Sequence, residues 1–305
     1  MTTTLLLICG LLALMIGGDA LVRGASGLAL RLGLPAFVVG LTIVGFGTSV
    51  PELLVSLSAA LDGRPGIAIG NVIGSNIANI LLILGVAAVI APVTARLAEV
   101  RNDLAWMLAA SLALPAALWS GFVGRIEGAA MVAALLLYLV LALRRGATAE
   151  AEDLPAPPLW QAVLYAGAGL VAVVLGADWL VRGASDIART FGVSEAMIGL
   201  SVVAVGTSLP ELAATLTAAI KGQRDIALGN VIGSNIFNVL GILGVTALVA
   251  PIPRDERFLT LDAPVAIAAA LILAGLLVWR GALSWLVGLA FLIAYGGYIA
   301  IGASL

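Results

Sequence analysis

The sequence predicts an all-α polytopic membrane protein with ten transmembrane helices, arranged as two inverted-topology repeats of five. Three observations carry this prediction: long apolar runs, an internal duplication and an odd number of runs in each copy. The 305 residues are 62% hydrophobic and only 10% charged, whereas a soluble domain of this size carries roughly a quarter charged residues. The chain is therefore expected to reside in a lipid bilayer.

The internal duplication is visible in the printed sequence. The segment GNVIGSN at 70–76 returns unchanged at 229–235. When 34–92 is aligned with 193–251 without a gap, more than half of the positions are identical. A repeat of this length at a constant offset indicates that one structural unit is present twice.

Each copy contains five apolar runs of about 20 residues, the length that crosses the hydrocarbon core. Because five is odd, the second copy enters the membrane upside down relative to the first, as in many secondary transporters. Broken helices are expected in spans 2, 3, 7 and 8. The ten spans are placed near 4–24, 34–61, 67–91, 103–121, 126–143, 160–182, 193–220, 226–250, 261–279 and 283–303.

The boundaries of the two repeats follow from these spans. The first repeat is expected over 1–143, with its ion-binding motifs within 40–92, and the second over 159–305, with motifs within 199–251. The segment 144–158 between them is rich in charge and proline, which is typical of a solvated linker. If the N-terminus lies outside, the inside loops contain more arginine and lysine than the outside loops. We therefore expect the N-terminus to lie outside.

Composition restricts the chemistry. The chain has no histidine and a single cysteine, Cys9, which argues against zinc, soft-metal sites and disulfides. No basic run interleaved with aromatic residues suggests nucleic acid. We expect no enzyme activity and no cofactor. An ion bound by this chain would have oxygen ligands, which favours hard cations such as Ca²⁺, Mg²⁺, Na⁺ or H⁺.

Two carboxylates lie in the middle of apolar runs. Glu52 ends the motif GTSVPE at 47–52, and Glu211 ends its echo GTSLPE at 206–211. An ionisable residue inside a membrane is costly and is a functional-site hypothesis by default. The preceding proline breaks the helix and frees backbone carbonyls beside the acid. A structural ion pair is the alternative, but spans 2, 3, 7 and 8 carry no basic residue away from their ends.

The second motif supplies neutral oxygens. Ser75 and Asn79 are four residues apart and share one face of a helix, as do Ser234 and Asn238. We expect these four side chains at the cation site, because two carboxylates alone cannot complete the shell of a hard cation. For the glycines of this motif, close helix packing is the favoured interpretation.

Charge balance suggests a mechanism. Two ionised glutamates in one midplane site carry a charge of −2, which one Ca²⁺, two Na⁺ or two H⁺ would cancel. Moving the empty site through a low-dielectric barrier is expensive. The sequence therefore favours an exchanger over a channel, and inverted repeats supply two conformations of similar energy for alternating access.

The paired motifs resemble the α-repeats of the cation/Ca²⁺ exchanger superfamily, specifically its prokaryotic Na⁺/Ca²⁺ exchanger branch. The resemblance extends over the whole chain and implies Na⁺/Ca²⁺ antiport in the cell membrane of a prokaryote. It implies that Glu52 and Glu211 bind both ions. It also implies that spans 1 and 6 slide across the rest. It assigns further oxygen ligands to Thr48, Ser49, Thr207 and Ser208, Na⁺ positions to Ser75 and Ser234, and backbone carbonyls near Gly45 and Ala204.

One position departs from that pattern: close relatives often carry Asp where this chain has Asn238, which argues against a K⁺ or proton role there. Two other functions remain open. An H⁺/Ca²⁺ antiporter could use the same scaffold, because neighbouring carboxylates raise one another's proton affinity. A solute symporter with broken helices is disfavoured, because the spans hold no base for an organic carboxylate.

Overall fold

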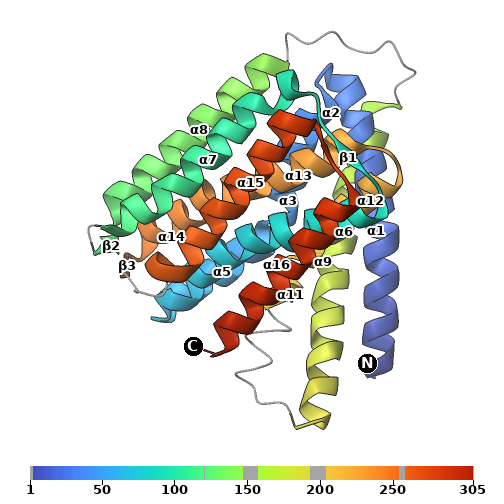
Figure 1. Ribbon diagram of the computed structural model, residues 1–305. Helices are drawn as coiled ribbons and strands as arrows, with labels where there is room; N and C mark the ends of the chain where they lie inside the picture. Colours follow the sequence, from blue (N-terminus) through green and yellow to red (C-terminus); the bar gives the residue numbers. More distant parts are fainter. Residues whose placement is uncertain (1–2, 120, 147–156, 193–203, 254–257, 305) are drawn as a thin grey trace.

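A computed structural model gives the fold for residues 3–119, 121–146, 157–192, 204–253 and 258–304 (Figure 1). The described residues are almost entirely helical, which confirms the predicted all-helical class. The first half of the chain contains α1 Thr3–Leu32, α2 Ala36–Val39, η1 Gly40–Val44, α3 Gly45–Thr48, α4 Val50–Leu61, α5 Pro65–Ile77, η2 Ala78–Ile83, α6 Leu84–Ile90, α7 Leu97–Trp119 and α8 Arg125–Gly146. The second half contains α9 Leu159–Thr190, α11 Ala204–Thr207, α12 Leu209–Ile220, α13 Arg224–Ile236, η4 Phe237–Leu243, α14 Gly244–Val249, η5 Phe258–Asp262, α15 Ala263–Arg280 and α16 Trp285–Ser304.

Length and hydropathy support a polytopic membrane fold. Among the described residues, seven helices are long and apolar enough to cross a bilayer, or eight if the bent pair at 36–61 is one span. The helix α7 and the short apolar helix α12 occupy the predicted spans 4 and 7 without meeting that criterion. The first half of predicted span 7, at 193–203, lies outside the described residues. The count of ten therefore stays a prediction.

The predicted break in span 2 is present as a bend. The helical segments 36–48 and 50–61 meet at an angle of 41°, with Ser49 between them at φ −84° and ψ 7°. Pro51 lies in the first turn of α4, and because proline has no N–H, the carbonyl of Gly47 loses its helical partner. The same arrangement recurs in the second copy, where Ser208 separates α11 from α12 and Pro210 follows.

Spans 3 and 8 are not broken as predicted. Residues 65–90 and 224–249 each form one continuous run, and the irregularity in each is a π-helical segment, η2 or η4, that starts just after the GNVIGSN motif. A π-helical segment widens the helix locally but leaves it continuous. Such segments are frequently found at functional sites. These two runs are also deeply buried, with 72% and 83% of their apolar windows inside the fold.

Helices α1 and α9 form a close antiparallel pair at one side of the molecule (Figure 1). Glycines repeat every seven residues along the contact, at 10, 17 and 24 in α1 and at 169, 176 and 183 in α9. A Cβ atom on Gly24 would lie 2.2 Å from the amide nitrogen of Ala166, and one on Gly169 would lie 2.3 Å from that of Leu21. Small residues thus bring the two backbones together, as in many membrane helix pairs.

Two very short antiparallel strand pairs join the halves of the chain, which the all-α prediction did not include. Strand β1, Val93–Thr94, pairs with β4, Ala282–Leu283, and β2, Phe122–Val123, pairs with β3, Ile252–Pro253. In each pair one strand comes from each copy of the duplication. The loops at the helix ends are therefore tied across the two copies.

Candidate ion-binding site

The bends in the two copies bring the two glutamates into the interior. Glu52 lies in the first turn of α4 and Glu211 in the first turn of α12. Each residue is only 1% exposed. The N-terminus of each short helix, which is the positive end of the helix dipole, therefore lies beside a buried acid.

Oxygen atoms crowd around Glu211. The Ser49 hydroxyl oxygen lies 2.7 Å from Oε1 of Glu211 and 2.9 Å from the carbonyl oxygen of Gly45. The Ser234 hydroxyl lies 3.0 Å from the same carbonyl. A single hydroxyl proton on Ser49 can be donated to only one of its two acceptors. The cluster therefore contains more acceptor oxygens than protons, which is the environment that a cation stabilises.

A second oxygen cluster surrounds Glu52 and repeats the first with the copies exchanged. The Ser208 hydroxyl lies 3.4 Å from Oε1 of Glu52 and 3.5 Å from the hydroxyl of Ser75. Ser208 corresponds to Ser49, and Ser75 corresponds to Ser234. Each cluster thus combines a glutamate from one copy with the serine at the bend of the other copy.

Several buried polar atoms of the site have no hydrogen-bond partner among the described residues. These are Oε2 of Glu52, Oε2 of Glu211, Oδ1 of Asn238 and both amide atoms of Asn79. No arginine or lysine among the described residues forms an ion pair with either glutamate. A buried carboxylate without a counter-charge is expensive. The unused oxygens are therefore expected to face a bound cation.

Asparagines from the second motif fix the geometry of the acids, a role that the sequence did not indicate. Asn71 donates to the carbonyl of Glu52 (3.1 Å) and to the hydroxyl of Ser56 (2.9 Å). In the other copy, Asn230 donates to the carbonyl of Glu211 at 3.2 Å. Both residues belong to the GNVIGSN motif, and their recurrence was the available signal.

The two threonines of the site contact these asparagines. The Thr48 hydroxyl lies 3.0 Å from the carbonyl of Val44 and 3.3 Å from Oδ1 of Asn230. The Thr207 hydroxyl lies 3.5 Å from Oδ1 of Asn71. Each threonine therefore links the bend of one copy to the second motif of the other.

A pair of amides crosses the interior beside the glutamates. Asn238 donates to Oδ1 of Asn76 at 3.0 Å, and Asn76 donates to the carbonyl of Asn235 at 3.2 Å. All predicted site residues except Thr207 are buried. The hydrogen bonds above link the threonines, serines and glutamates into two clusters, one around each glutamate, whereas Asn238 belongs to the separate amide pair. Asn79 is buried on the same helical run as Ser75, but its side-chain amide forms no hydrogen bond within the part of the chain that the structure describes.

The comparisons with known proteins decide the family. A family model described as "Sodium/calcium exchanger protein" matches residues 2–144 and 161–302. This chain belongs to the sodium/calcium exchanger family. It is 37% identical over 281 residues to the inner membrane protein YrbG of Escherichia coli (strain K12), covering 88% of this chain and 86% of that protein.

Two further relatives of this exchanger-family chain are informative. The sodium/calcium exchanger MaX1 of Methanosarcina acetivorans is 33% identical over 315 residues, covering 88% of this chain and 89% of MaX1. Among solved structures, the sodium-calcium exchanger NCX_Mj soaked with 2.5 mM Na⁺ and 0.1 mM Ca²⁺ matches with a TM-score of 0.88 at 33% identity, covering 98% of each chain. Both comparisons extend over nearly the whole exchanger-family chain.

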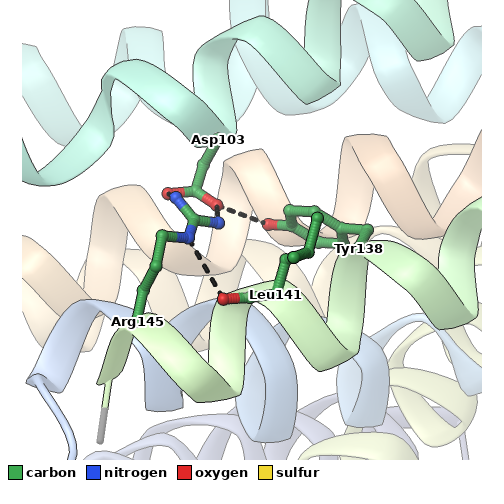
Figure 2. Close-up of polar contacts among 4 residues, drawn as sticks. All are labelled: Asp103, Tyr138, Leu141 and Arg145. Carbon is green, nitrogen blue, oxygen red and sulfur yellow. Dashed lines mark hydrogen bonds and ion pairs between the residues drawn. The ribbon is translucent and has the colours of Figure 1, made fainter. Parts of the chain in front are cut away.

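A second polar cluster of this exchanger-family protein was missed by the sequence analysis. Asp103 is 3% exposed. It accepts hydrogen bonds from Tyr138 (3.0 Å) and from Nη2 of Arg145 (2.9 Å), so that it joins α7 to α8 (Figure 2). In the second copy, Asp262 accepts a hydrogen bond from Tyr298 at 2.9 Å. The signal was the position of the two aspartates, which lie at equivalent positions of the duplication.

Proposed function

We propose that this protein is a secondary antiporter that exchanges Na⁺ for Ca²⁺ across the membrane by alternating access to a site built on Glu52 and Glu211. The observation that carries the proposal is the pair of buried carboxylates, each with one unpartnered oxygen. Each is also approached by a serine from the opposite copy. Membership of the sodium/calcium exchanger family supports the same ions.

The proposed ligands come from both motifs of both copies. Glu52 and Glu211 supply the charge, and the remaining residues supply neutral oxygens of the kind that Ca²⁺ and Na⁺ accept. The full set is Thr48, Ser49, Glu52, Ser75, Asn79, Thr207, Ser208, Glu211, Ser234 and Asn238. The hydroxyls of Thr48 and Thr207 also contact Asn230 and Asn71, which helps to position those two asparagines.

Charge balance links this site to exchange. Two ionised glutamates carry a charge of −2, which one Ca²⁺ or two Na⁺ would neutralise. An empty site would carry that charge across the interior without compensation, at a cost that far exceeds that of the loaded site. The protein therefore changes conformation when loaded, and one cation is moved only in return for another.

We further propose ten spans in two inverted repeats, over 1–143 and 159–305, joined by the linker 144–158. The two separate matches of the family model, at 2–144 and 161–302, support this division. So do the strand pairs that exchange partners between the copies. The distribution of basic residues supports an N-terminus outside the cell, in the plasma membrane of a prokaryote.

The two sides of the site differ in exposure, which is what alternating access requires. Thr48 and Asn230 are completely buried, whereas their counterparts Thr207 and Asn71 are partly exposed. On the buried side α1 packs against α12, where a Cβ atom on Gly18 would lie 2.6 Å from the hydroxyl of Thr217. One side of the site is thus closed by α1 while the other is more open.

The test is Ca²⁺ uptake into proteoliposomes driven by an outward Na⁺ gradient. Glu52→Gln and Glu211→Gln keep the size of the side chain but remove its charge. Each variant should lower uptake by about 100-fold, since losing a contact to a charged group costs up to about 3 kcal/mol. Glu99→Gln makes the same change at an exposed surface pair with Arg96 and should transport normally.

Three results would contradict the proposal. Normal uptake in either glutamate variant would remove the site assignment. Uptake that ignores Na⁺ and follows a pH gradient would establish H⁺/Ca²⁺ antiport on this scaffold instead. A single-channel Ca²⁺ current would show that the protein conducts Ca²⁺ as a channel instead of exchanging it. Retention of the monodisperse peak in size-exclusion chromatography controls for folding of each variant.

A further inference from the structure

A pocket separate from the glutamate site lies between the ends of α7 and α8. Its volume is about 500 Å³. Three residues of α7 and three of α8 line it, each set on one face of its helix: Asn102, Ala105 and Trp106, and Leu141, Arg144 and Arg145. The pocket therefore combines two cationic side chains with an amide, an indole and an apolar wall.

The two arginines of this pocket are in different electrostatic situations. Arg145 is paired with Asp103 through Nη2 at 2.9 Å, and its Nε donates to the carbonyl of Leu141 at 3.2 Å (Figure 2). Its charge is therefore compensated and its side chain is fixed. Arg144 is exposed and forms no ion pair with any described acid. One positive charge in the pocket thus has no counter-charge among the described residues.

The depth of the pocket identifies the medium around it. Residues 125–145 form one apolar helix with an arginine at each end, so Arg144 and Arg145 lie where the hydrocarbon core meets the headgroups. Trp106 packs against Tyr138 with a centroid distance of 5.4 Å, and tryptophan favours this interfacial level. The pocket therefore opens at the depth of lipid phosphates and glycerol groups.

An apolar surface continues from the pocket toward the middle of α8. Leu141 is 38% exposed and lines the pocket; its neighbour Val140 is 48% exposed, and Leu137, one turn further in, is 53% exposed. Such a surface at the side of a membrane helix is suited to acyl chains. A soluble anion would use the arginine but would gain nothing from these side chains.

We propose that this pocket binds a phospholipid with a net negative headgroup. Arg144 and Asn102 contact the phosphate, Trp106 lies beside the glycerol, and one acyl chain follows Leu141 and Leu137. The fixed Arg145–Asp103 pair shapes the wall without adding net charge. A single arginine that has no acidic partner among the described residues favours a lipid with one net negative charge, such as phosphatidylglycerol, over zwitterionic phosphatidylcholine.

The test is native mass spectrometry of the purified full-length chain with phosphatidylglycerol or phosphatidylcholine that carry the same acyl chains. The wild type should retain phosphatidylglycerol about fivefold more strongly, which corresponds to ~1 kcal/mol for one basic residue at the membrane surface. Arg144→Gln should remove most of this preference. Because Arg144 has no ion-pair partner among the described residues, the variant should fold and transport Ca²⁺ normally.

Arg280→Gln is the matched control. Arg280 also lies at the end of an apolar helix beside a tryptophan, 5.2 Å from the ring of Trp279, but it does not line this pocket. Equal losses in both variants would show a general charge effect and overturn the proposal. Displacement of the lipid by millimolar glycerol phosphate would do the same, because it would show that a soluble anion is the occupant.

Discussion

The Ser49 hydroxyl lies 2.7 Å from Oε1 of Glu211, although the two residues are 162 positions apart. The counterpart contact, between Ser208 and Glu52, is longer, at 3.4 Å. Each acid is thus approached by a hydroxyl from the opposite copy, so that neither half of the chain contains a complete site. The shorter of these two contacts lies on the side of the site where Thr48 and Asn230 are completely buried, and the longer one lies on the more exposed side.

This inequality predicts different effects for two equivalent substitutions. Ser49→Ala should raise the Kd for Ca²⁺ by about tenfold, because a short hydrogen bond to a charged group is worth roughly 1.5–3 kcal/mol. Ser208→Ala should raise it by about two- to threefold, because its contact is long and therefore weak. Isothermal titration calorimetry on purified protein measures both values. A larger effect for Ser208→Ala would contradict the ordering of the two clusters.

The two predicted amide ligands should separate stability from ion binding. Asn238 donates to Oδ1 of Asn76, so Asn238→Leu leaves that oxygen buried without a partner. We expect this variant to lower the free energy of unfolding by about 1–3 kcal/mol in the absence of ions. Thermal unfolding in chelator and low Na⁺ measures the change.

Asn79→Leu is the comparison, because neither side-chain amide atom of Asn79 has a hydrogen-bond partner among the described residues. This variant should be at least as stable as the wild type without ions, since a buried unpaired amide is itself costly. It should gain less stability than the wild type when Na⁺ or Ca²⁺ is added, because the stabilisation by a ligand at a fixed concentration grows with the logarithm of its affinity. A normal gain would exclude Asn79 as a ligand.

The close contact between α1 and α9 also predicts opposite effects for two glycines. In Gly24→Ala the new methyl group would meet the backbone of Ala166 at 2.2 Å, so α1 and α9 must separate. We expect a loss of about 1–3 kcal/mol or more. Gly167 on α9 is exposed, and no described atom lies within 4 Å of its Cβ position. Gly167→Ala should therefore gain about 0.5–1 kcal/mol. Denaturant unfolding in detergent tests whether the signs differ.

The sequence predicted what depends on repetition and spacing. The duplication identified Glu52 and Glu211 as equivalent residues. Because each acid lies in an apolar run without a basic partner, we expected both to be functional. The proline after each bend predicted the break at Ser49 that the structure contains. These inferences need only the local sequence and the cost of burying a charge.

The partner of each oxygen could not be predicted in this way. Which serine approaches which glutamate depends on how the two copies cross, and the contact between Ser49 and Glu211 joins distant parts of the chain. The Asp103–Arg145 pair is likewise 42 residues apart and involves a linker-proximal arginine. The irregularity of spans 3 and 8 was misjudged because glycine and asparagine favour both a break and a π-helical segment.

A final prediction concerns the closed side of the site. Lys221, in the turn after α12, forms an ion pair with Asp19 of α1, which is also held by Arg23 at 2.7 Å. The residue equivalent to Lys221 in the first copy is Asp62, which pairs with Arg64 in its own loop instead. If α1 moves away from α12 during exchange, this pair stabilises only the conformation described here.

Lys221→Gln should therefore lower the population of that conformation by about two- to fivefold at low salt, because partly exposed ion pairs are worth up to about 1 kcal/mol. At roughly 1 M salt the difference from wild type should vanish, since charges are screened within about 3 Å. Double electron–electron resonance measures the population of this conformation in a Cys9→Ser background, with spin labels on cysteines introduced at the exposed positions of Ile16 and Ile220. Arg64→Gln, which breaks the pair within the other loop, is the control. An unchanged distance distribution in Lys221→Gln would mean that the pair is formed equally in both conformations.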